Sequence, residues 1–195
     1  MKKENAFFPI LNYHALSDGG FSPDGIYILT KEVFQKQLDT LARNRMQSVS
    51  LEEVWQWLSG KRNLPERSVV LTFDDGRTSD FSVAVPLLRQ YGFRATFFVN
   101  PGTLDTEGYL TKDVLREIAH SGMEIGSHGF DHLFLTTLAD ADLAVQVETS
   151  KIELEILLGK EIHFFSIPRG RYDERVLKAI RDAGYRLACT SDVGL

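Results

Sequence analysis

Several features that would assign the chain to a specialised class are scarce or missing in its sequence. Cys189 is the single cysteine among 195 residues, so no disulfide can form within the chain, and a reducing compartment is favoured. No run approaches the roughly 20 apolar residues that a membrane-spanning helix requires. The formal net charge of −5 offers no basic surface, which argues against nucleic acid as a partner.

The N-terminus also lacks a recognisable secretory leader. Lys2 and Lys3 are followed by Glu4, Asn5 and then Pro9, which leave no continuous apolar segment. As written, the sequence therefore indicates a cytoplasmic protein, and an extracytoplasmic one if a leader has been removed. Nothing in the sequence indicates an oligomeric state.

Hydrophobic residues, in contrast, are plentiful. They make up 43% of the sequence and include thirteen phenylalanines. A chain of this length can remove roughly 70% of its unfolded surface from water, which argues against disorder and permits a sizeable core. No low-complexity tract or block of charge marks a boundary, so we expect a single domain over residues 1–195.

A recurring local pattern predicts the architecture. An amphipathic helix, a glycine just past its end and a short apolar strand follow one another, as at Tyr91-Gly92-Phe93 and Ala183-Gly184-Tyr185. This alternation predicts an α/β fold with a parallel sheet buried under helices. A parallel barrel or barrel-like closure, which need not be complete at its C-terminal end, is favoured over an open doubly wound sheet. We expect helices near residues 31–43, 51–58, 80–91, 112–120, 140–158 and 174–183, and strands near 8–13, 47–50, 68–73, 94–99, 123–126, 162–166 and 185–190.

Two stretches, 15–29 and 100–110, lack any periodicity. Both follow expected strands, so we expect them to form loops at the carboxyl end of the sheet. Folds of the α/β class place their functional loops at that end.

Two aspartates and two histidines are the most informative residues. Asp74 and Asp75 end the apolar run that starts at Ser68, and His128 and His132 follow another expected strand. Taken alone, Asp-Gly is a common turn pair, and two histidines four residues apart are often only solvated. Both clusters, however, follow strands of the same predicted sheet and can meet at its carboxyl end. Two adjacent carboxylates are also costly unless a cation neutralises one of them.

One carboxylate, two imidazoles and a vacant position for water form a catalytic zinc arrangement, and Co²⁺, Ni²⁺ or iron could use the same ligands. The second carboxylate would then be free to move protons. An iron oxygenase with two histidines and one carboxylate has the same ligand count, but the paired aspartates and the α/β pattern disfavour it.

The motifs Thr72-Phe-Asp-Asp-Gly76 and Ser127-His-Gly-Phe-Asp-His132 resemble the first two signature motifs of the polysaccharide deacetylase family, which is the NodB-homology domain of carbohydrate esterase family 4. The resemblance covers most of the chain, from Tyr13-His14 to Cys189-Thr-Ser-Asp192. It implies a distorted β/α barrel and the metal-dependent removal of acetyl groups from amino sugars.

Carried over by position, Asp75, His128 and His132 would hold the divalent metal, most simply Zn²⁺, and Asp74 would be the general base. A bound metal of this kind lowers the pKa of a water to about 7 and polarises the acetyl carbonyl. The substrate implied is an acetylated amino sugar or a glycan that contains one.

The third motif departs from the family pattern. Ser166 stands where the family has an arginine that braces the catalytic aspartate, and Arg169 or Arg171 could substitute for it. The segment Pro168, Arg169 and Gly170 is the candidate for contacting the substrate or its oxyanion.

The general acid is the other departure, because the late Leu-x-His motif that usually supplies it is missing. Relatives that resemble biofilm poly-N-acetylglucosamine deacetylases instead have a Tyr-His near the N-terminus. Tyr13-His14 ends the first expected strand, so His14 is the candidate acid. A histidine with an ordinary pKa of about 6.5 is suited to protonating a leaving amine. The alternative is a histidine that only ends a strand.

The favoured function is therefore a metal-dependent N-deacetylase of an amino sugar or glycan. Two alternatives stay open. The same site could hydrolyse an O-acetyl ester or another amide, or the chain could be a carbohydrate-binding protein that has lost catalysis. Retention of all four metal and base residues disfavours the latter.

Overall fold

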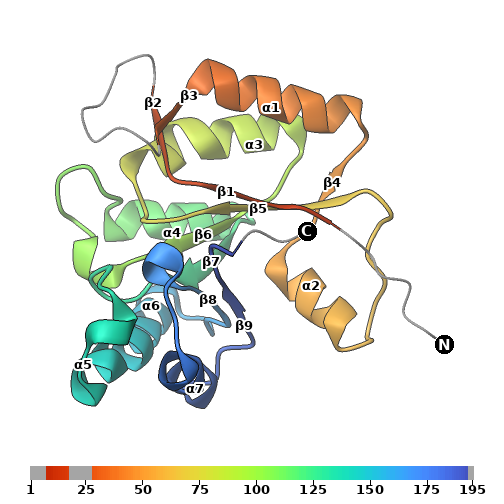
Figure 1. Cartoon of the computed structure of the whole chain (residues 1–195). Helices are drawn as coiled ribbons and strands as arrows, with labels where there is room; N and C mark the ends of the chain where they lie inside the picture. The colour runs from red at the N-terminus through yellow and green to blue at the C-terminus, as the bar shows by residue number, and fades with distance from the viewer. Residues whose placement is uncertain (1–7, 18–27, 193–195) are drawn as a thin grey trace.

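A curved parallel sheet organises the molecule (Figure 1). The computed structural model describes residues 8–17 and 28–192. The strands pair in the order β1-β5-β6-β7-β8-β9, and β4 pairs with the first two residues of β5, which gives seven parallel strands. Their bounds are β1 (Ile10–Tyr13), β4 (Gln47–Ser48), β5 (Ser68–Phe73), β6 (Thr96–Val99), β7 (Glu124–Ser127), β8 (Phe164–Ser166) and β9 (Leu187–Cys189).

The strand order distinguishes the two architectures that the sequence allows. A doubly wound sheet reverses its strand order at a switch point, whereas here each later strand from β5 onward adds on the same side. Among the described residues no hydrogen-bonded pairing joins β1 to β9, so the sheet is a half-barrel. The predicted parallel, barrel-like α/β fold is confirmed.

Helices connect the strands where the periodicity predicts them. The expected helices at 80–91 and 140–158 are each interrupted by one π-helical turn, η1 (Asp80–Ala84) and η4 (Val145–Thr149). Within the described residues no helix combines the length and the apolarity needed to traverse a membrane. The α-helices are α1 (Lys31–Arg43), α2 (Leu51–Leu58), α3 (Val85–Tyr91), α4 (Lys112–His120), α5 (Asp140–Ala144), α6 (Ser150–Leu158) and α7 (Glu174–Asp182).

Side-chain caps fix four of these helix starts. Thr30, Ser50, Thr111 and Asp173 each accept a hydrogen bond from a backbone N–H in the first turn, which satisfies a group that has no partner within the helix. Ser50 and Glu53 complete a capping box at α2.

The prediction of a loop over residues 15–29 is partly wrong. Within 15–29, β2 (Ala15–Ser17) and β3 (Ile28–Thr30) pair as a separate two-stranded parallel sheet, and residues 18–27 lie outside the described residues. Leu16 is buried, and its N–H donates to Ser79 Oγ at 3.0 Å. These strands are three residues long and depend on distant partners, so periodicity cannot reveal them. The expected loop 100–110 contains one 3₁₀ turn, η2 (Pro101–Thr103).

The two faces of the sheet form separate apolar layers, because successive strand residues point to opposite faces. On the outer face, Leu71, Phe73 and Phe97 pack in the main core with side chains of α1, α3, α4, α6 and α7, and the rings of Phe73 and Phe97 stack at 4.8 Å. Figure 1 shows α1 and α3 side by side along β1 and β5. On the inner face, Val70 and Phe98 belong to a smaller cluster with Phe164 and residues of α2.

The amino end of the half-barrel is closed by α2. Glu124, at the start of β7, accepts hydrogen bonds from the N–H groups of Leu51 and Glu52 and from the hydroxyl of Thr96. A carboxylate at this position satisfies the N-terminal amides of α2 and complements the helix dipole. The carboxyl end, in contrast, carries polar side chains.

Candidate active site

Three of the predicted residues converge at the carboxyl end of the sheet. Asp75 follows β5, while His128 and His132 follow β7, with β6 between the two strands. Their ligand atoms all lie within 4.8 Å of one another. Asp75 Oδ1 is 3.6 Å from His128 Nε2 and 3.4 Å from His132 Nε2. The two segments therefore meet as the sequence predicts.

These separations fit a divalent cation. Tetrahedral coordination with bonds of 2.0–2.1 Å places neighbouring ligand atoms about 3.3 Å apart. His128 Nε2 and Asp75 Oδ1 are buried and have no hydrogen-bond partner among the described residues. Several unpartnered atoms around one point are unfavourable, and a cation there would satisfy them.

The tautomer of His128 suits this role. Its Nδ1 lies 2.9 Å from the backbone carbonyl oxygen of Ser166, which can only accept, so Nδ1 carries the proton and Nε2 presents a lone pair to the cluster. His132 is half-buried. Burial holds the pKa of His132 below its usual value, which favours the neutral imidazole. Both rings are thus in the form that ligates metals.

The loops that carry these ligands are conformationally unusual. Asp75 has φ of 80° and His132 has φ of 58°, in a region that residues other than glycine rarely adopt. Backbone strain of this kind is concentrated at functional sites, because the surrounding structure must hold it.

Arg77 holds the other oxygen of Asp75. Its guanidinium lies 3.6 Å from Asp75 Oδ2 and stacks over the ring of Tyr109 at 4.4 Å. Asp75 therefore directs one oxygen to Arg77 and the other to the two histidines.

Two buried amides hold the histidine loop, and sequence reasoning missed both. Asn100 donates to the carbonyl oxygens of His128 and Gly129, and Gln146 Oε1 accepts from the N–H groups of Phe130 and Asp131, each at 2.9 Å. A polar residue directly after an apolar strand was the available signal for Asn100. No local pattern distinguishes Gln146.

Asp74 lies beside the cluster but is held by other residues. Its Oδ2 accepts hydrogen bonds from Asn12 Nδ2 at 3.0 Å and from Ser166 Oγ at 3.2 Å, and it is 4.0 Å from His128 Nε2. Its Oδ1 is buried without a hydrogen-bond partner among the described residues. The contact with Asn12 was not predicted.

The remaining predicted residues surround this end of the sheet. His14 is half-buried and directly follows β1, whose last residue, Tyr13, accepts a hydrogen bond from the Asp74 N–H at 2.9 Å. Pro168, Arg169 and Gly170 form the 3₁₀ turn η5 after β8.

Both candidate replacements for the family arginine stack on one aromatic ring. The guanidinium of Arg169 lies 4.4 Å from the ring centre of Phe134, and that of Arg171 lies 5.4 Å from it. Among the described residues, neither arginine donates a hydrogen bond to Asp74.

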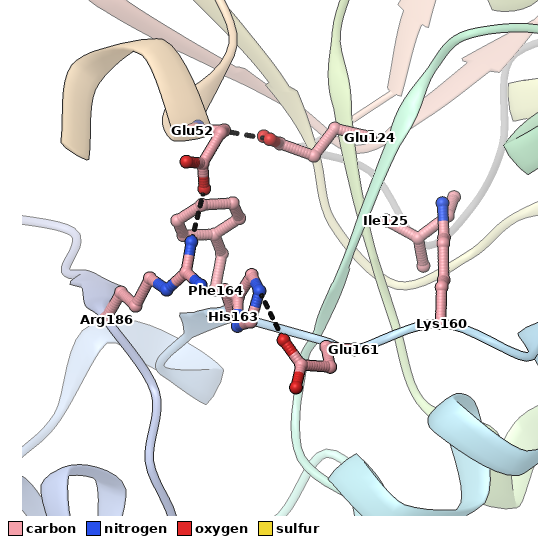
Figure 2. A pocket seen from close by; sticks show the side chains of 8 residues that line it. All are labelled: Glu52, Glu124, Ile125, Lys160, Glu161, His163, Phe164 and Arg186. Atoms are coloured by element: carbon pink, nitrogen blue, oxygen red, sulfur yellow. Dashed lines mark hydrogen bonds and ion pairs between the residues drawn. The ribbon is translucent and has the colours of Figure 1, made fainter. Parts of the chain in front are cut away.

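A separate cavity lies at the amino ends of β7, β8 and β9 (Figure 2). It has a volume of about 320 Å³ and includes the Glu52–Arg186 ion pair at 2.7 Å and the Glu161–His163 pair at 3.2 Å. Burial raises the pKa of Glu124 and lowers that of Lys160. Paired charges of both signs line this cavity, and it contains no predicted site residue, so we assign the chemistry to the carboxyl end.

Comparison with known proteins identifies the family. Residues 61–188 match the family described as polysaccharide deacetylase. The chain is 32% identical to YxkH of Bacillus subtilis, a polysaccharide deacetylase by name, over 97% of its own length and 66% of that protein. It is 35% identical to the peptidoglycan-N-acetylglucosamine deacetylase of Bacillus cereus over 62% of this chain and 55% of that protein. The chain thus spans between about half and two thirds of the length of these relatives.

The fold gives the same result. The chain superposes on the Streptococcus pyogenes deacetylase PplD, solved in complex with acetate, with a TM-score of 0.89 and 28% sequence identity, over 96% of this chain and 84% of that one. The half-barrel of parallel strands with surrounding helices is therefore the NodB-type deacetylase fold. This chain belongs to the polysaccharide deacetylase family.

Proposed function

We propose that the chain is a metal-dependent N-deacetylase that acts on a glycan containing N-acetylglucosamine. Asp75, His128 and His132 would hold a divalent cation, most simply Zn²⁺. The observation that carries the proposal is the convergence of their three lone-pair donors beside Asp74, a second carboxylate that is not part of the cluster. The named activity of the Bacillus cereus relative and the acetate bound to PplD support the substrate class.

When bound, the cation supplies a water of lowered pKa and polarises the acetyl carbonyl. Asp74 acts as the general base. Its carboxylate lies beside the cluster, with Oδ2 4.0 Å from His128 Nε2. Its Oδ1 has no hydrogen-bond partner among the described residues, so this oxygen can accept the proton of the attacking water. General-base assistance of this kind contributes roughly 10²–10⁴-fold to a rate.

His14 acts as the general acid. The amine must leave with a proton, so the reaction needs a proton donor. His14 directly follows β1, two residues after Asn12, which contacts Asp74. Continued strand alternation would turn the two side chains to the same face. His14 thus belongs to the same end of the sheet as the base.

The turn after β8 contacts the substrate through one backbone amide. Pro168 has no N–H, and the Gly170 N–H already donates to the Ile167 carbonyl at 2.9 Å. The amide of Arg169 is therefore the member of this segment that can bind the acetyl oxygen as negative charge develops on it.

An acetate-release screen tests the proposal. The substrates are N-acetylglucosamine oligomers, peptidoglycan fragments, β-1,6-linked N-acetylglucosamine polymers and small acetyl esters, each assayed with zinc-loaded and chelator-treated protein. We expect close to one bound zinc ion and acetate release from at least one glycan, with loss of release on chelation. Release that survives complete metal removal would contradict the mechanism, and release from esters alone would favour an O-acetyl esterase. Metal binding without any release would favour a carbohydrate-binding protein.

Two substitutions separate the roles of the residues. Asp74→Asn should retain the metal and lose roughly 10²–10⁴-fold in turnover, because only the base is removed. His128→Gln should lose both metal and turnover. His163→Gln is the matched control, since His163 lines the cavity at the opposite end of the sheet (Figure 2). A wild-type rate in Asp74→Asn would show that the base is another group.

A further inference from the structure

The carboxylate of Asp74 is held at one oxygen by two neutral donors from distant parts of the sheet. Asn12 Nδ2 reaches Oδ2 from β1, at 3.0 Å, and Ser166 Oγ reaches the same oxygen from β8, at 3.2 Å. β1 neighbours β5, whereas β8 lies three strands away across the curved inner face. The two donors therefore approach Oδ2 from opposite sides of the half-barrel.

A second hydrogen bond fixes the orientation of the Asn12 amide. An ionised carboxylate only accepts, so the NH₂ group of Asn12 must face Asp74, and its Oδ1 then faces Thr72. The Thr72 hydroxyl donates to that Oδ1 at 3.0 Å, and Asn12 and Thr72 are directly paired between β1 and β5. The register of these strands thus turns the NH₂ group of Asn12, and not its carbonyl oxygen, toward Asp74.

Ser166 links the base to the cation cluster. Its hydroxyl donates to Asp74 Oδ2, while its backbone carbonyl accepts from His128 Nδ1 at 2.9 Å. The two interactions use different atoms of one residue. Removal of the hydroxyl alone therefore leaves the support of His128 in place.

We propose that Asn12 and Ser166 are positioning residues that together orient the Asp74 carboxylate, to which no arginine of the described residues donates a hydrogen bond. This inference rests on the proposed function of Asp74 as the base. With Oδ2 fixed by two donors, Oδ1 is left as the buried, unpartnered oxygen that takes the proton. Arg169 and Arg171 are stacked on Phe134 instead.

The test compares Asn12→Leu and Ser166→Ala with wild type, each loaded with zinc. A hydrogen bond to a charged group is worth enough to change a rate by about tenfold to a hundredfold. We expect each variant to lose that factor in kcat, with little change in KM and in the dissociation constant for zinc. Ser68→Ala is the matched control, because Ser68 is a buried serine of the same sheet whose hydroxyl donates to Pro65.

A double-mutant cycle distinguishes positioning from a merely structural role. In an Asp74→Ala background, Asn12→Leu and Ser166→Ala should no longer lower the residual rate, because the group they orient is gone. If Asn12→Leu does not fold, Thr72→Val provides a second route, since it leaves Asn12 in place but releases its amide; it should show a smaller loss of the same kind.

The outcomes separate this inference from the proposed function. Wild-type protein that releases no acetate from any substrate would overturn both. An active wild type whose kcat is unchanged in Asn12→Leu and Ser166→Ala would overturn this inference alone. An equal loss with and without Asp74, or a loss accompanied by weaker zinc binding, would also overturn it.

Discussion

Removal of the cation should lower the thermal stability of the protein by a measurable amount. Asp75, His128 and His132 present their ligand atoms to one another at 3.4 and 3.6 Å, so we expect the folded chain to bind a divalent cation far more tightly than the unfolded chain does. At a free zinc concentration one hundred times the dissociation constant, this linkage adds about 2.7 kcal/mol to the free energy of unfolding. For a chain of this size, 1 kcal/mol shifts Tm by about 2–4 °C, so we expect a shift of roughly 5–11 °C.

Calorimetry or circular dichroism can measure this shift on chelator-treated protein before and after zinc is added back. His132→Ala and Asp75→Ala should abolish it, because each leaves only two ligands. Asp74→Asn should preserve it, because Asp74 is not a ligand, and His163→Gln should preserve it as a histidine control. Equal melting temperatures with and without zinc would refute the assignment of the cluster as a metal site, as would an undiminished shift in His132→Ala.

Three further perturbations test other parts of the structure. Burial, with some repulsion from Asp75 and Asp74, raises the pKa of Asp80 well above its usual value, so its contribution to stability is complete below the unfolded pKa of about 4 and is lost as pH rises toward the folded pKa. Asp80→Asn should therefore be more stable than wild type in urea unfolding of metal-free protein at pH 8, with the gain shrinking toward pH 4; a gain independent of pH would contradict this reasoning. Gly126→Ala should lower the free energy of unfolding by about 1–3 kcal/mol in the same assay, because the new Cβ would lie 2.5 Å from the Phe98 ring and 2.9 Å from the Phe164 carbonyl oxygen. A change near zero would contradict this, because it would mean that these neighbours move aside at no cost. His14→Ala should lower kcat by about 10²-fold or more with zinc affinity unchanged, and an unchanged kcat would remove His14 from the mechanism.

The parts of the site that follow from local rules could be predicted from the sequence. The Asp74-Asp75 pair and His128 come directly after strands, and parallel strands place such residues at one edge of the sheet. The convergence of Asp75 and His128 therefore required no knowledge of the contacts. The helix starts could also be predicted from the sequence, because a capping residue such as Ser50 bonds to a residue within the first turn of its helix. These rules relate residues that are close in sequence or equivalent in the strand–helix repeat.

The supporting residues could not be predicted in this way. Asn12 meets Asp74 across 62 residues, and Gln146 reaches the histidine loop from a helix. Both contacts depend on strand register and on helix rotation, which the sequence does not display locally. The short strands β2 and β3 were missed for the same reason, since each is defined only by its pairing with the other.

The division of the inner face explains how one half-barrel supports both stability and chemistry. Toward the amino end, Glu124 makes three hydrogen bonds with α2 and Thr96, and the apolar layer around Phe98 excludes water. Toward the carboxyl end, the same alternation of side chains presents Asp74 and His128, each with a buried atom that the described residues leave without a partner. Such groups are costly, and the well-packed end offsets that cost. The polar end thus retains acceptors that a cation and a substrate can use.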